Sequence, residues 1–246
     1  MKRIQIAYPL DSSGLIEKDY IEESKFMSYQ GFMISGKIQN NIDGLIYRGH
    51  KIWKPEDCLQ HSKIYQGWEE VKKTSYMNEY YPIIKEATIP TIFIENIDYQ
   101  LIQDISSKKS WDKIFIKSPS RSLFAYGDFT SVWPDTSIEE MNILFNEIGV
   151  TGPFAIRKFI DDPEIFYNEQ RYWILNGNAY HPSGEIPDFV KEYGKKMYEF
   201  SGSHYFTMDV AGDYIVEINP GESSDRGGDN PLDWFCEIFA KEFLHK

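Results

Sequence analysis

The sequence predicts a folded protein of mixed class, in which an α/β lobe precedes a region of β-hairpins and helices that is α+β in character. Two observations lead to this prediction. Over residues 1–106, short apolar strands alternate with helical stretches, as they do in an α/β unit. Over residues 107–246, strands joined by tight turns share the chain with long amphipathic helices.

The composition supports a globular chain and disfavours several classes of function. Of the 246 residues, 41% are hydrophobic and 16% are aromatic, far more than an intrinsically disordered chain carries. The formal net charge of -12 disfavours a general nucleic-acid binder, because phosphate recognition requires a basic surface. The first ten residues hold no apolar run of the length of a signal peptide or a membrane span, and the two cysteines form no metal or redox motif. We therefore expect a cytoplasmic protein.

Hydrophobic periodicity and residues that favour strand and helix ends predict the elements of the N-terminal lobe. The first strand alternates apolar and polar residues and stops at a proline. The first helix is indicated by a proline and two acidic residues, which favour a helix N-terminus. The predicted strands are 3–8, 31–35, 45–47 and 91–94, and the predicted helices begin at residues 54 and 74, the second running to 85.

The segment 107–121 is distinguished by its charge. Five basic side chains stand there against a single acid, in a chain that is acidic overall. Its apolar run, 114–116, is a predicted strand with Lys117 at its exit, and the serine-rich stretch 118–128 is a predicted loop. The remaining elements predicted for this region are a helix over 137–149 and a strand over 154–160.

Turn signals and amphipathic patterns define the C-terminal part. Two two-residue turns, Asn176-Gly177 and Gly212-Asp213, each separate strand-like runs and predict β-hairpins. The chain closes on a helix whose apolar side is largely aromatic. The predicted strands are 171–175, 204–211 and 214–219, and the predicted helices are 188–200 and 231–246.

Three oxygen-bearing side chains in the second hairpin are the main candidates for chemistry. Residues two apart in a strand point to the same side, so Glu217 and Asn219 project together, and the hairpin turn brings Asp209 back beside them. Carboxylate and amide oxygens that converge on one face form the ligand set of Mg²⁺, usually with phosphate oxygens completing the shell. The alternative is that all three are ordinary surface residues, although a position inside apolar strands is costly without partners.

Phosphate binding requires cations, and several basic side chains are candidates. Lys117 at a strand end and Arg121 on the following loop suit a loop that covers phosphates. Glu169 and Arg171 share one strand face, where an acid can bond ribose hydroxyls and an arginine can hold a phosphate. Each of these could instead be a solvated surface residue or part of a salt-bridge ladder. Neither a P-loop nor a Gly-x-Gly-x-x-Gly fingerprint occurs in the sequence.

These segments resemble the ATP-grasp superfamily, whose pieces occur here in the same order. The strand with a terminal lysine resembles the one that precedes the family's mobile phosphate loop, and the last hairpin, the most specific part, resembles its metal-binding pair of strands. The run 45–49 followed by a helix is also similar to an ATP-grasp branch found in phages and bacteria. The matching segments are Phe115-Ile-Lys117, 155–160, Glu169-x-Arg171 with Gly177, Met208-Asp209 and Glu217-x-Asn219.

The resemblance implies an ATP-grasp fold with a small N-terminal lobe over 1–106 and an ATP-grasp domain over 107–246. That domain divides into a central subdomain, about 107–160, and a C-terminal one, about 161–246, which clamp ATP between them. The implied cofactors are ATP and Mg²⁺, with Asp209, Glu217 and Asn219 as metal ligands. The implied nucleotide contacts are Lys117, Arg121, Arg157, Lys158, Phe159, Ile160, Glu169 and Arg171, of which Lys158 to Ile160 lie on the adenine side.

The implied reaction is an ATP-dependent ligation that joins a carboxylate to an amine or thiol through an acylphosphate, with release of ADP and phosphate. Lys117, Arg171 and Arg226 are the candidate catalytic cations, since such a reaction depends mainly on alignment and charge neutralisation. The loop 118–128 is the candidate lid. The sequence departs from the family pattern at Thr207, where many members carry arginine, and in having one glycine in the loop; Arg226 could supply the missing charge.

Other functions stay open at this point. The same clamp serves a kinase, and a degenerate ATP-grasp protein binds nucleotide without turnover; a hydrolase built on a carboxylate pair is more remote. Thr207 favours the degenerate protein, whereas the intact metal-ligand set opposes it. The acceptor, which is a small molecule, a peptide or a protein, and the oligomeric state are not specified. Arg48 is either an acceptor contact or a buried structural arginine.

Overall fold

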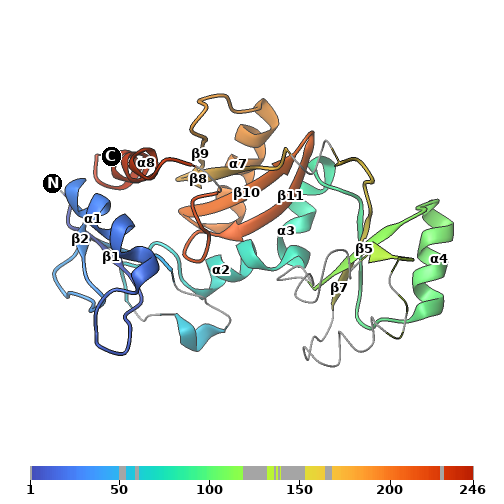
Figure 1. The fold of residues 1–246 in the computed structure, drawn as a ribbon, viewed down its shortest axis with the longest axis horizontal. Helices are drawn as coiled ribbons and strands as arrows, with labels where there is room; N and C mark the ends of the chain where they lie inside the picture. Colours follow the sequence, from blue (N-terminus) through green and yellow to red (C-terminus); the bar gives the residue numbers. More distant parts are fainter. Residues whose placement is uncertain are drawn as a thin grey trace.

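The computed structural model describes residues 2–49, 54–58, 61–118, 132–135, 137, 139, 153–163, 168–227 and 230–245. Within these residues, three β-sheets follow one another along the longest axis of the molecule, with helices packed on their faces (Figure 1). The N-terminal sheet is parallel and the other two are antiparallel. The molecule is therefore α/β at one end and α+β in the rest, as the sequence predicts.

The N-terminal lobe is a small parallel sheet of order β2-β1-β3 with a helix packed beside it. Its middle strand is covered on both faces, so it is an apolar run broken only by Gln5. The amide of Gln5 is satisfied, since it donates to the Lys37 carbonyl at 2.9 Å and accepts from the backbone N–H of Gln39 at 2.9 Å. The elements are β1 (Ile4–Ala7), η1 (Lys18–Tyr20), α1 (Ile21–Tyr29), β2 (Met33–Ile34) and β3 (Gly44–Tyr47).

The middle sheet is four-stranded and antiparallel, with the order β11-β10-β8-β9. Its first hairpin turns at Asn176 and Gly177, whose φ angles of 49° and 79° are the left-handed values that a tight two-residue turn requires. Two helices, α3 and α7, cover one face of this sheet with apolar side chains. The elements are α2 (Trp68–Ser75), α3 (Met77–Ile84), β8 (Gln170–Leu175), β9 (Asn178–Tyr180), α7 (Asp188–Ser201), β10 (Tyr205–Ala211) and β11 (Tyr214–Pro220).

The third sheet, of order β4-β7-β5-β6, is inserted in the chain between α3 and β8. Thr88, at the point of entry, pairs with Ile215 of β11, and its hydroxyl donates to the Ile215 carbonyl at 2.6 Å. The helix α4 packs on this sheet through Ile102 and Ile105. The elements are η3 (Lys85–Ala87), β4 (Thr91–Ile94), α4 (Tyr99–Lys109), β5 (Ile114–Lys117), β6 (Val132–Trp133) and β7 (Phe154–Lys158).

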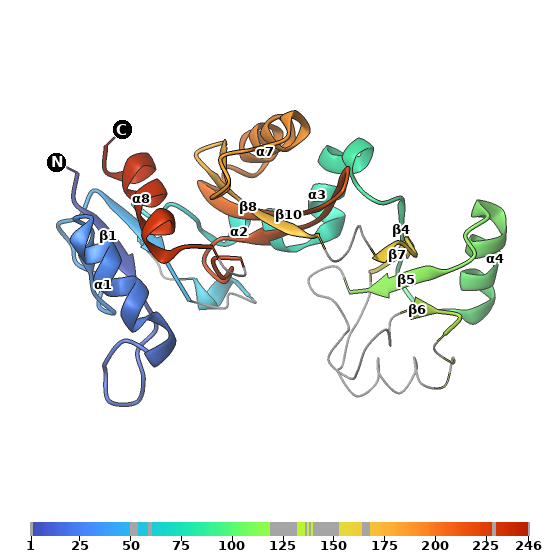
Figure 2. The same cartoon turned by 45° about the horizontal axis from the view of Figure 1, so that its top comes forward.

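The helix α8 (Leu232–Phe243) closes the molecule against its N-terminal lobe. Phe235, Phe239 and Phe243 stand four residues apart and form one stripe, with successive ring centroids 4.8 and 5.5 Å apart. This stripe packs on Trp173 of the middle sheet and on the apolar residues of the lobe, forming the largest core. As a result α1 and α8, which are far apart in sequence, lie side by side (Figure 1 and Figure 2).

The strands and the two long C-terminal helices lie where the sequence predicts them, but the two earlier helix predictions differ from the structure. The helix predicted over 74–85 is present as α3, but it begins only at Met77, because Tyr76 is extended, with ψ of 114°. A helix that the sequence did not predict, α2, precedes it and begins after Gly67, whose backbone N–H donates to Glu70. The residues after Lys54 form only the 3-10 turn η2 (Pro55–Asp57), which ends at an extended Cys58.

Some predictions fall on parts of the chain that lie outside the described residues. These are most of the loop 118–128 and nearly all of the helix 137–149. The predicted division at residue 106 falls within α4, and the strands on either side of that helix belong to one sheet.

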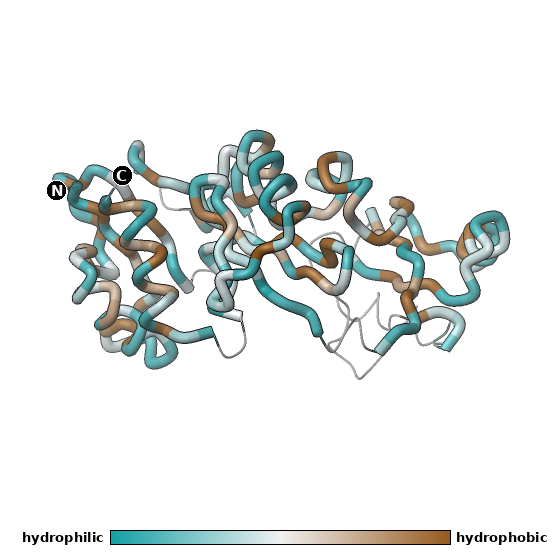
Figure 3. Tube along the Cα trace, turned by 90° about the horizontal axis from the view of Figure 1, so that it is seen from above, coloured by the Kyte–Doolittle hydropathy of each residue, from teal (hydrophilic) through white to brown (hydrophobic). Residues whose placement is uncertain are grey.

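Along the helices, hydrophobic and hydrophilic residues alternate (Figure 3). In the described part of the chain we find no helix whose length and apolar character would let it span a membrane.

Candidate functional site

One face of the middle sheet carries a row of charged side chains across three neighbouring strands. Arg171 of β8 lies opposite Asp209 of β10, which in turn lies opposite Glu217 of β11. Asn219 follows Glu217 by two residues and therefore shares its side of the strand. The pattern of the hairpin thus brings Asp209, Glu217 and Asn219 together, as the sequence predicts, and adds Arg171 to them.

Every carboxylate oxygen of this row accepts a hydrogen bond from a nitrogen of the chain itself. Arg171 pairs with Asp209 at two points, Nε to Oδ1 and Nη2 to Oδ2, both at 2.7 Å. The Asn219 amide donates to Asp209 Oδ2 at 3.0 Å and to Glu217 Oε2 at 3.2 Å. Lys117 donates through Nζ to the remaining oxygen, Glu217 Oε1. The side chains of Arg171, Asn219 and Lys117 therefore engage all four carboxylate oxygens of Asp209 and Glu217, which are oxygens suited to binding a metal ion.

Lys117 reaches the row from the neighbouring sheet. It is the last residue of β5, and its side chain is only 2% exposed, whereas that of Glu217 is 26% exposed. The strand is fixed by its buried residues Ile114 and Ile116, so the ammonium group is delivered to a defined point. The ion pair of Lys117 with Glu217 joins the middle sheet to the third sheet.

The charges of the row shift one another's pKa. Burial acts to raise the pKa of Glu217, but the Lys117 charge and the hydrogen bonds from Lys117 and Asn219 outweigh it and hold that pKa below its usual value. Burial raises the pKa of Asp209, although the Arg171 pair opposes the shift. Burial disfavours the charge of Arg171, yet its acidic partners raise its pKa. Glu217 is thus held in the ionised state that cation binding requires.

Two further acids border the row. Glu169 directly precedes β8, and burial together with the charges of Asp209 and Glu217 raises its pKa. Asp225, in the loop after β11, accepts a hydrogen bond from Nη1 of Arg171. Sequence reasoning did not single out Asp225, because its contact depends on how the loop folds back over β8.

Arg157 lies between the middle and third sheets and is enclosed by them. Its Nη1 donates to the Val216 carbonyl at 2.9 Å, and its Nη2 donates to Thr88 Oγ1 at 3.1 Å. Its Nε is buried and has no hydrogen-bond partner among the residues that the structure describes. Burial lowers the pKa of Arg157. The side chain bridges β7 to β11 and keeps one buried donor unused.

The predicted adenine-side segment follows Arg157 directly. The backbone N–H of Lys158 donates to the Pro90 carbonyl at 3.1 Å, and that of Phe159 donates to the Lys113 carbonyl at 3.1 Å. The Lys158 side chain is exposed and that of Ile160 is half-buried. By the strand register Lys158 pairs with Ile114, at the other end of β5 from Lys117, so this segment continues β7 beyond that end of the third sheet. The remaining phosphate candidate, Arg121, lies outside the described residues.

Arg48 is a structural contact between the N-terminal lobe and the loop after β11. Its Nε and Nη2 pair with both carboxylate oxygens of Glu23 at 2.9 and 3.0 Å. Its Nη1 donates to the carbonyls of Gly221 at 2.7 Å and Ser224 at 2.8 Å. The guanidinium is fully buried and lies over the rings of Trp173 and Phe235. Of the two interpretations left open by the sequence, the structural one describes this side chain.

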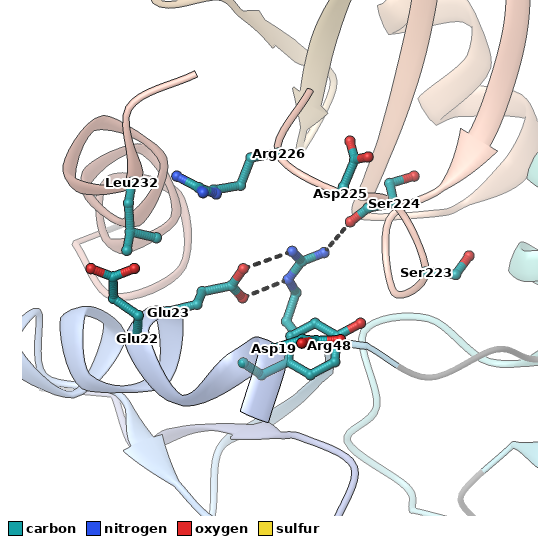
Figure 4. A pocket seen from close by; sticks show the side chains of 10 residues that line it. Asp19, Glu22, Glu23, Arg48, Ser223, Ser224, Asp225, Arg226 and Leu232 are labelled. Carbon is teal, nitrogen blue, oxygen red and sulfur yellow. Dashed lines mark hydrogen bonds and ion pairs between the residues drawn. The ribbon is translucent and has the colours of Figure 1, made fainter. Parts of the chain in front are cut away.

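A cavity of about 270 Å³ opens beside Arg48, between α1 and the loop after β11 (Figure 4). Arg226 lines it, and its Nη1 donates to the Asn230 carbonyl at 3.1 Å. In Figure 4 the Arg226 guanidinium lies toward Leu232, and no ion pair or hydrogen bond between described residues joins it to the row. The cavity is nevertheless adjacent to the row, because Asp225 lines it and also contacts Arg171.

The position two residues before Asp209 is filled by Thr207. Its side chain is fully buried, and its hydroxyl shares a hydrogen bond with that of Ser224 at 3.1 Å. The cation that contacts Asp209 comes instead from the opposite strand, as Arg171. A positive charge at this place therefore does not depend on the residue at position 207.

Comparison with known proteins finds a likeness in structure and none in sequence. No protein-family model matches the chain, and no curated protein sequence matches it. The D-cycloserine synthetase DcsG matches with a TM-score of 0.65 and 11% identity, over 97% of this chain and 99% of that one. The ATP-grasp ligase PsnB, complexed with a phosphomimetic precursor variant, Mg and ADP, matches with a TM-score of 0.60 and 10% identity, over 98% and 97%.

A third solved structure extends the likeness. The D-alanine–D-alanine ligase of Bacillus anthracis complexed with ATP matches with a TM-score of 0.61 and 14% identity, over 100% of this chain and 98% of that one. All three matches span nearly the whole of both chains, so the likeness includes the N-terminal lobe as well as the two antiparallel sheets. At these identities it concerns the fold.

Proposed function

We propose that this chain, which has the ATP-grasp fold, is an ATP-dependent ligase that joins a carboxylate to an amine. One observation carries the proposal: two carboxylates and two cations meet between the sheets that an ATP-grasp protein uses as its clamp. The carboxylates are those of Asp209 and Glu217, and the cations are Arg171 and Lys117. A metal–phosphate site needs this combination of charges. The burial of Lys117, whose side chain is only 2% exposed, distinguishes the row from an ordinary surface salt-bridge ladder.

The donor set of the row fits Mg²⁺. Asp209, Glu217 and the amide of Asn219 carry hard oxygen ligands, and the Asn219 amide nitrogen lies within hydrogen-bonding distance of both carboxylates. In the structure the Asn219 amide presents its nitrogen to the carboxylates, so metal binding requires this group to turn and present its oxygen. The same oxygens are engaged by Lys117 and Arg171, so a metal ion competes with these cations for them.

The cations of the site fit a nucleotide. Lys117 and Arg171 would exchange their carboxylate partners for phosphate oxygens, which keeps their charges compensated. The unused Nε of Arg157 supports a further acceptor between the two sheets. The segment of Lys158, Phe159 and Ile160 is the proposed adenine side. For Glu169 and Arg121 we propose ribose and phosphate contacts respectively.

When bound, Mg·ATP would supply an electrophilic γ-phosphoryl group to activate a substrate carboxylate, with ADP as the leaving group, and an amine would then displace phosphate. The chain's own part is to align the reactants and to neutralise charge. Arg171 stands between the row and the cavity and is the group we assign to the developing negative charge. Lys117 fixes the phosphates from the side of the third sheet, and Arg226 contacts the acceptor.

The cavity beside the row is where we propose that the acceptor binds. It is bounded by the N-terminal lobe and by the loop that carries Asp225 and Arg226. Its volume, about 270 Å³, suits one residue of a peptide or a small molecule. The similar proteins support both kinds of acceptor, since one is a D-alanine–D-alanine ligase and another, PsnB, was also solved with a precursor peptide.

The test is a calorimetric titration of Mg·ATP into the wild-type protein and into Glu217→Gln and Asn219→Ala, alongside ADP release on a panel of amino acids and peptides. We expect saturable Mg-dependent binding that both substitutions weaken, and ADP release only when a carboxylate and an amine are present together. Glu199→Gln, an exposed acid on α7, is the matched control and should bind like wild type. Binding without turnover would favour a kinase or a non-catalytic nucleotide binder, and no binding would refute the proposal.

A further inference from the structure

Arg171 is shared between two carboxylates of very different surroundings. Its Nε and Nη2 pair with Asp209, whose side chain is 4% exposed, and its Nη1 pairs with Asp225, whose side chain is 78% exposed. Asp209 belongs to the row, whereas Asp225 lies in the loop that lines the cavity. The guanidinium thus stands at the junction of the proposed metal site and the proposed acceptor site.

The loop presents Asp225 to Arg171 in a fixed manner. The backbone N–H of Gly227 donates to Asp225 Oδ1 at 2.8 Å, which orients the carboxylate. Gly227 has φ of 89° and passes so close to Arg171 that an added Cβ would lie 2.7 Å from the arginine Cβ. The Arg226 carbonyl between them is held by Trp173 Nε1 at 3.2 Å and by Asn230 Nδ2 at 2.7 Å. Asp225 is therefore built into the edge of the site.

A metal ion at Asp209 competes with Arg171 for this carboxylate, because the guanidinium engages both oxygens and its positive charge repels the ion. Until a nucleotide supplies phosphate oxygens, a partly buried arginine released by its carboxylate partner would be uncompensated, which is costly. Asp225 removes that cost, since it keeps the guanidinium paired at the edge of the row. Asp209 and Asp225 are therefore alternative ion-pair partners of Arg171.

We propose that Asp225 is a positioning residue for Arg171: it retains the guanidinium when Asp209 passes to a metal ion, and so lowers the metal concentration at which nucleotide binds. The part that concerns metal and nucleotide rests on the proposed function. The part that concerns the sharing of Arg171 does not, and it is tested in the protein without ligands.

The first experiment is a double-mutant cycle of Asp209→Asn and Asp225→Asn, read as the urea midpoint of unfolding without nucleotide or metal. We expect each single substitution to shift the midpoint little, because the other acid still holds Arg171. The double variant should lose more than the sum of the two single losses. Additive losses would overturn the sharing of Arg171, whatever the protein binds.

The second experiment measures the Mg²⁺ concentration that half-saturates ADP binding, by titrating Mg²⁺ into protein with a fixed concentration of ADP. Asp225→Asn should raise this concentration about three- to tenfold, the effect of one charge-assisted hydrogen bond at an exposed position. Asp225→Glu should restore most of the loss. Asp213→Asn, an exposed acid in the hairpin turn, removes the same charge elsewhere and should change nothing.

The outcomes separate this proposal from the proposed function. If the wild-type protein binds no ADP at any Mg²⁺ concentration, the proposed function fails, while the cycle still decides whether the two acids share Arg171. If ADP binds but Asp225→Asn needs no more Mg²⁺ than Asp213→Asn, the positioning role is refuted. The role is also refuted if Asp225→Asn shifts the Mg²⁺ requirement equally in an Asp209→Asn background, where there is no competition to relieve.

Discussion

Replacing Lys117 by methionine keeps most of the buried volume of the side chain but removes the cation that contacts Glu217. Breaking a buried ion pair by deleting one partner typically costs about 3–5 kcal/mol. Glu217 is 26% exposed and keeps the hydrogen bond from Asn219, so solvent and the amide offset part of this loss. We therefore expect Lys117→Met to lower the free energy of unfolding by about 1–3 kcal/mol at pH 7.

The loss should depend on pH in a defined direction. In the wild-type protein Lys117 holds the pKa of Glu217 below its usual value, so the carboxylate stabilises the fold above the unfolded pKa. That stabilisation disappears as the pH falls through the lowered folded pKa. Without Lys117 the lowering is absent, so the difference between wild type and variant should shrink as the pH falls below about 4.3, through the lowered folded pKa of Glu217.

Urea unfolding followed by tryptophan fluorescence at pH 7 and at acidic pH measures both effects. Lys113→Met is the matched control, because Lys113 is 37% exposed and pairs with Asp135 at 3.1 Å on the surface. The control should cost less than about 1 kcal/mol. A loss for Lys117→Met no larger than that of the control, or a loss that persists unchanged in acid, would show that the pair with Glu217 is not the contact we take it to be.

Two further predictions concern buried charges outside the row. Glu222 is fully buried, its pKa is raised by burial to about 8, and its Oε1 has no hydrogen-bond partner in the described part of the chain. Because the folded state binds the Glu222 proton more tightly than the unfolded state, the free energy of unfolding of the wild type should fall as the pH rises from about 4.3 to 8. Glu222→Gln should lack this pH dependence and should be more stable than the wild type by up to about 3 kcal/mol at pH 8. A urea series from pH 5 to 9 checks this, and an unchanged slope contradicts it. Arg48→Met leaves Glu23 buried beside Tyr8 without its cation and should cost about 3–5 kcal/mol, read as a lower urea midpoint; a cost below about 1 kcal/mol is the contrary result.

The parts of the fold and site that follow from local rules could be predicted from the sequence. Strand parity places Glu217 and Asn219 on one side, and the Gly212-Asp213 turn returns Asp209 to them. Both depend on residues at most about ten positions apart. The late start of the helix predicted from Thr74 has a local cause as well, since one extended residue, Tyr76, separates α2 from α3, which begins at Met77.

The parts that depend on how sheets and loops pack could not be predicted. Lys117 and Glu217 are 100 residues apart in sequence and meet only because two sheets adjoin. An arginine such as Arg48 is a common ligand-binding residue, and its burial against Glu23 and the loop after β11 results from tertiary packing. Asp225 belongs to no recognisable sequence motif, because it reaches Arg171 only through the conformation of the loop after β11.

The insertion of the third sheet between α3 and β8 has a mechanical consequence. One stretch of backbone, near Thr88, leads into this sheet and a second one leads out of it after β7, so the sheet is tethered at two points. Thr88 and Arg157 hold its near end against β11. A ligand that draws Lys117 away from Glu217 would remove one of the contacts that hold this sheet against β11. The contacts of Thr88 and Arg157 with β11 do not involve Lys117 and would remain in place.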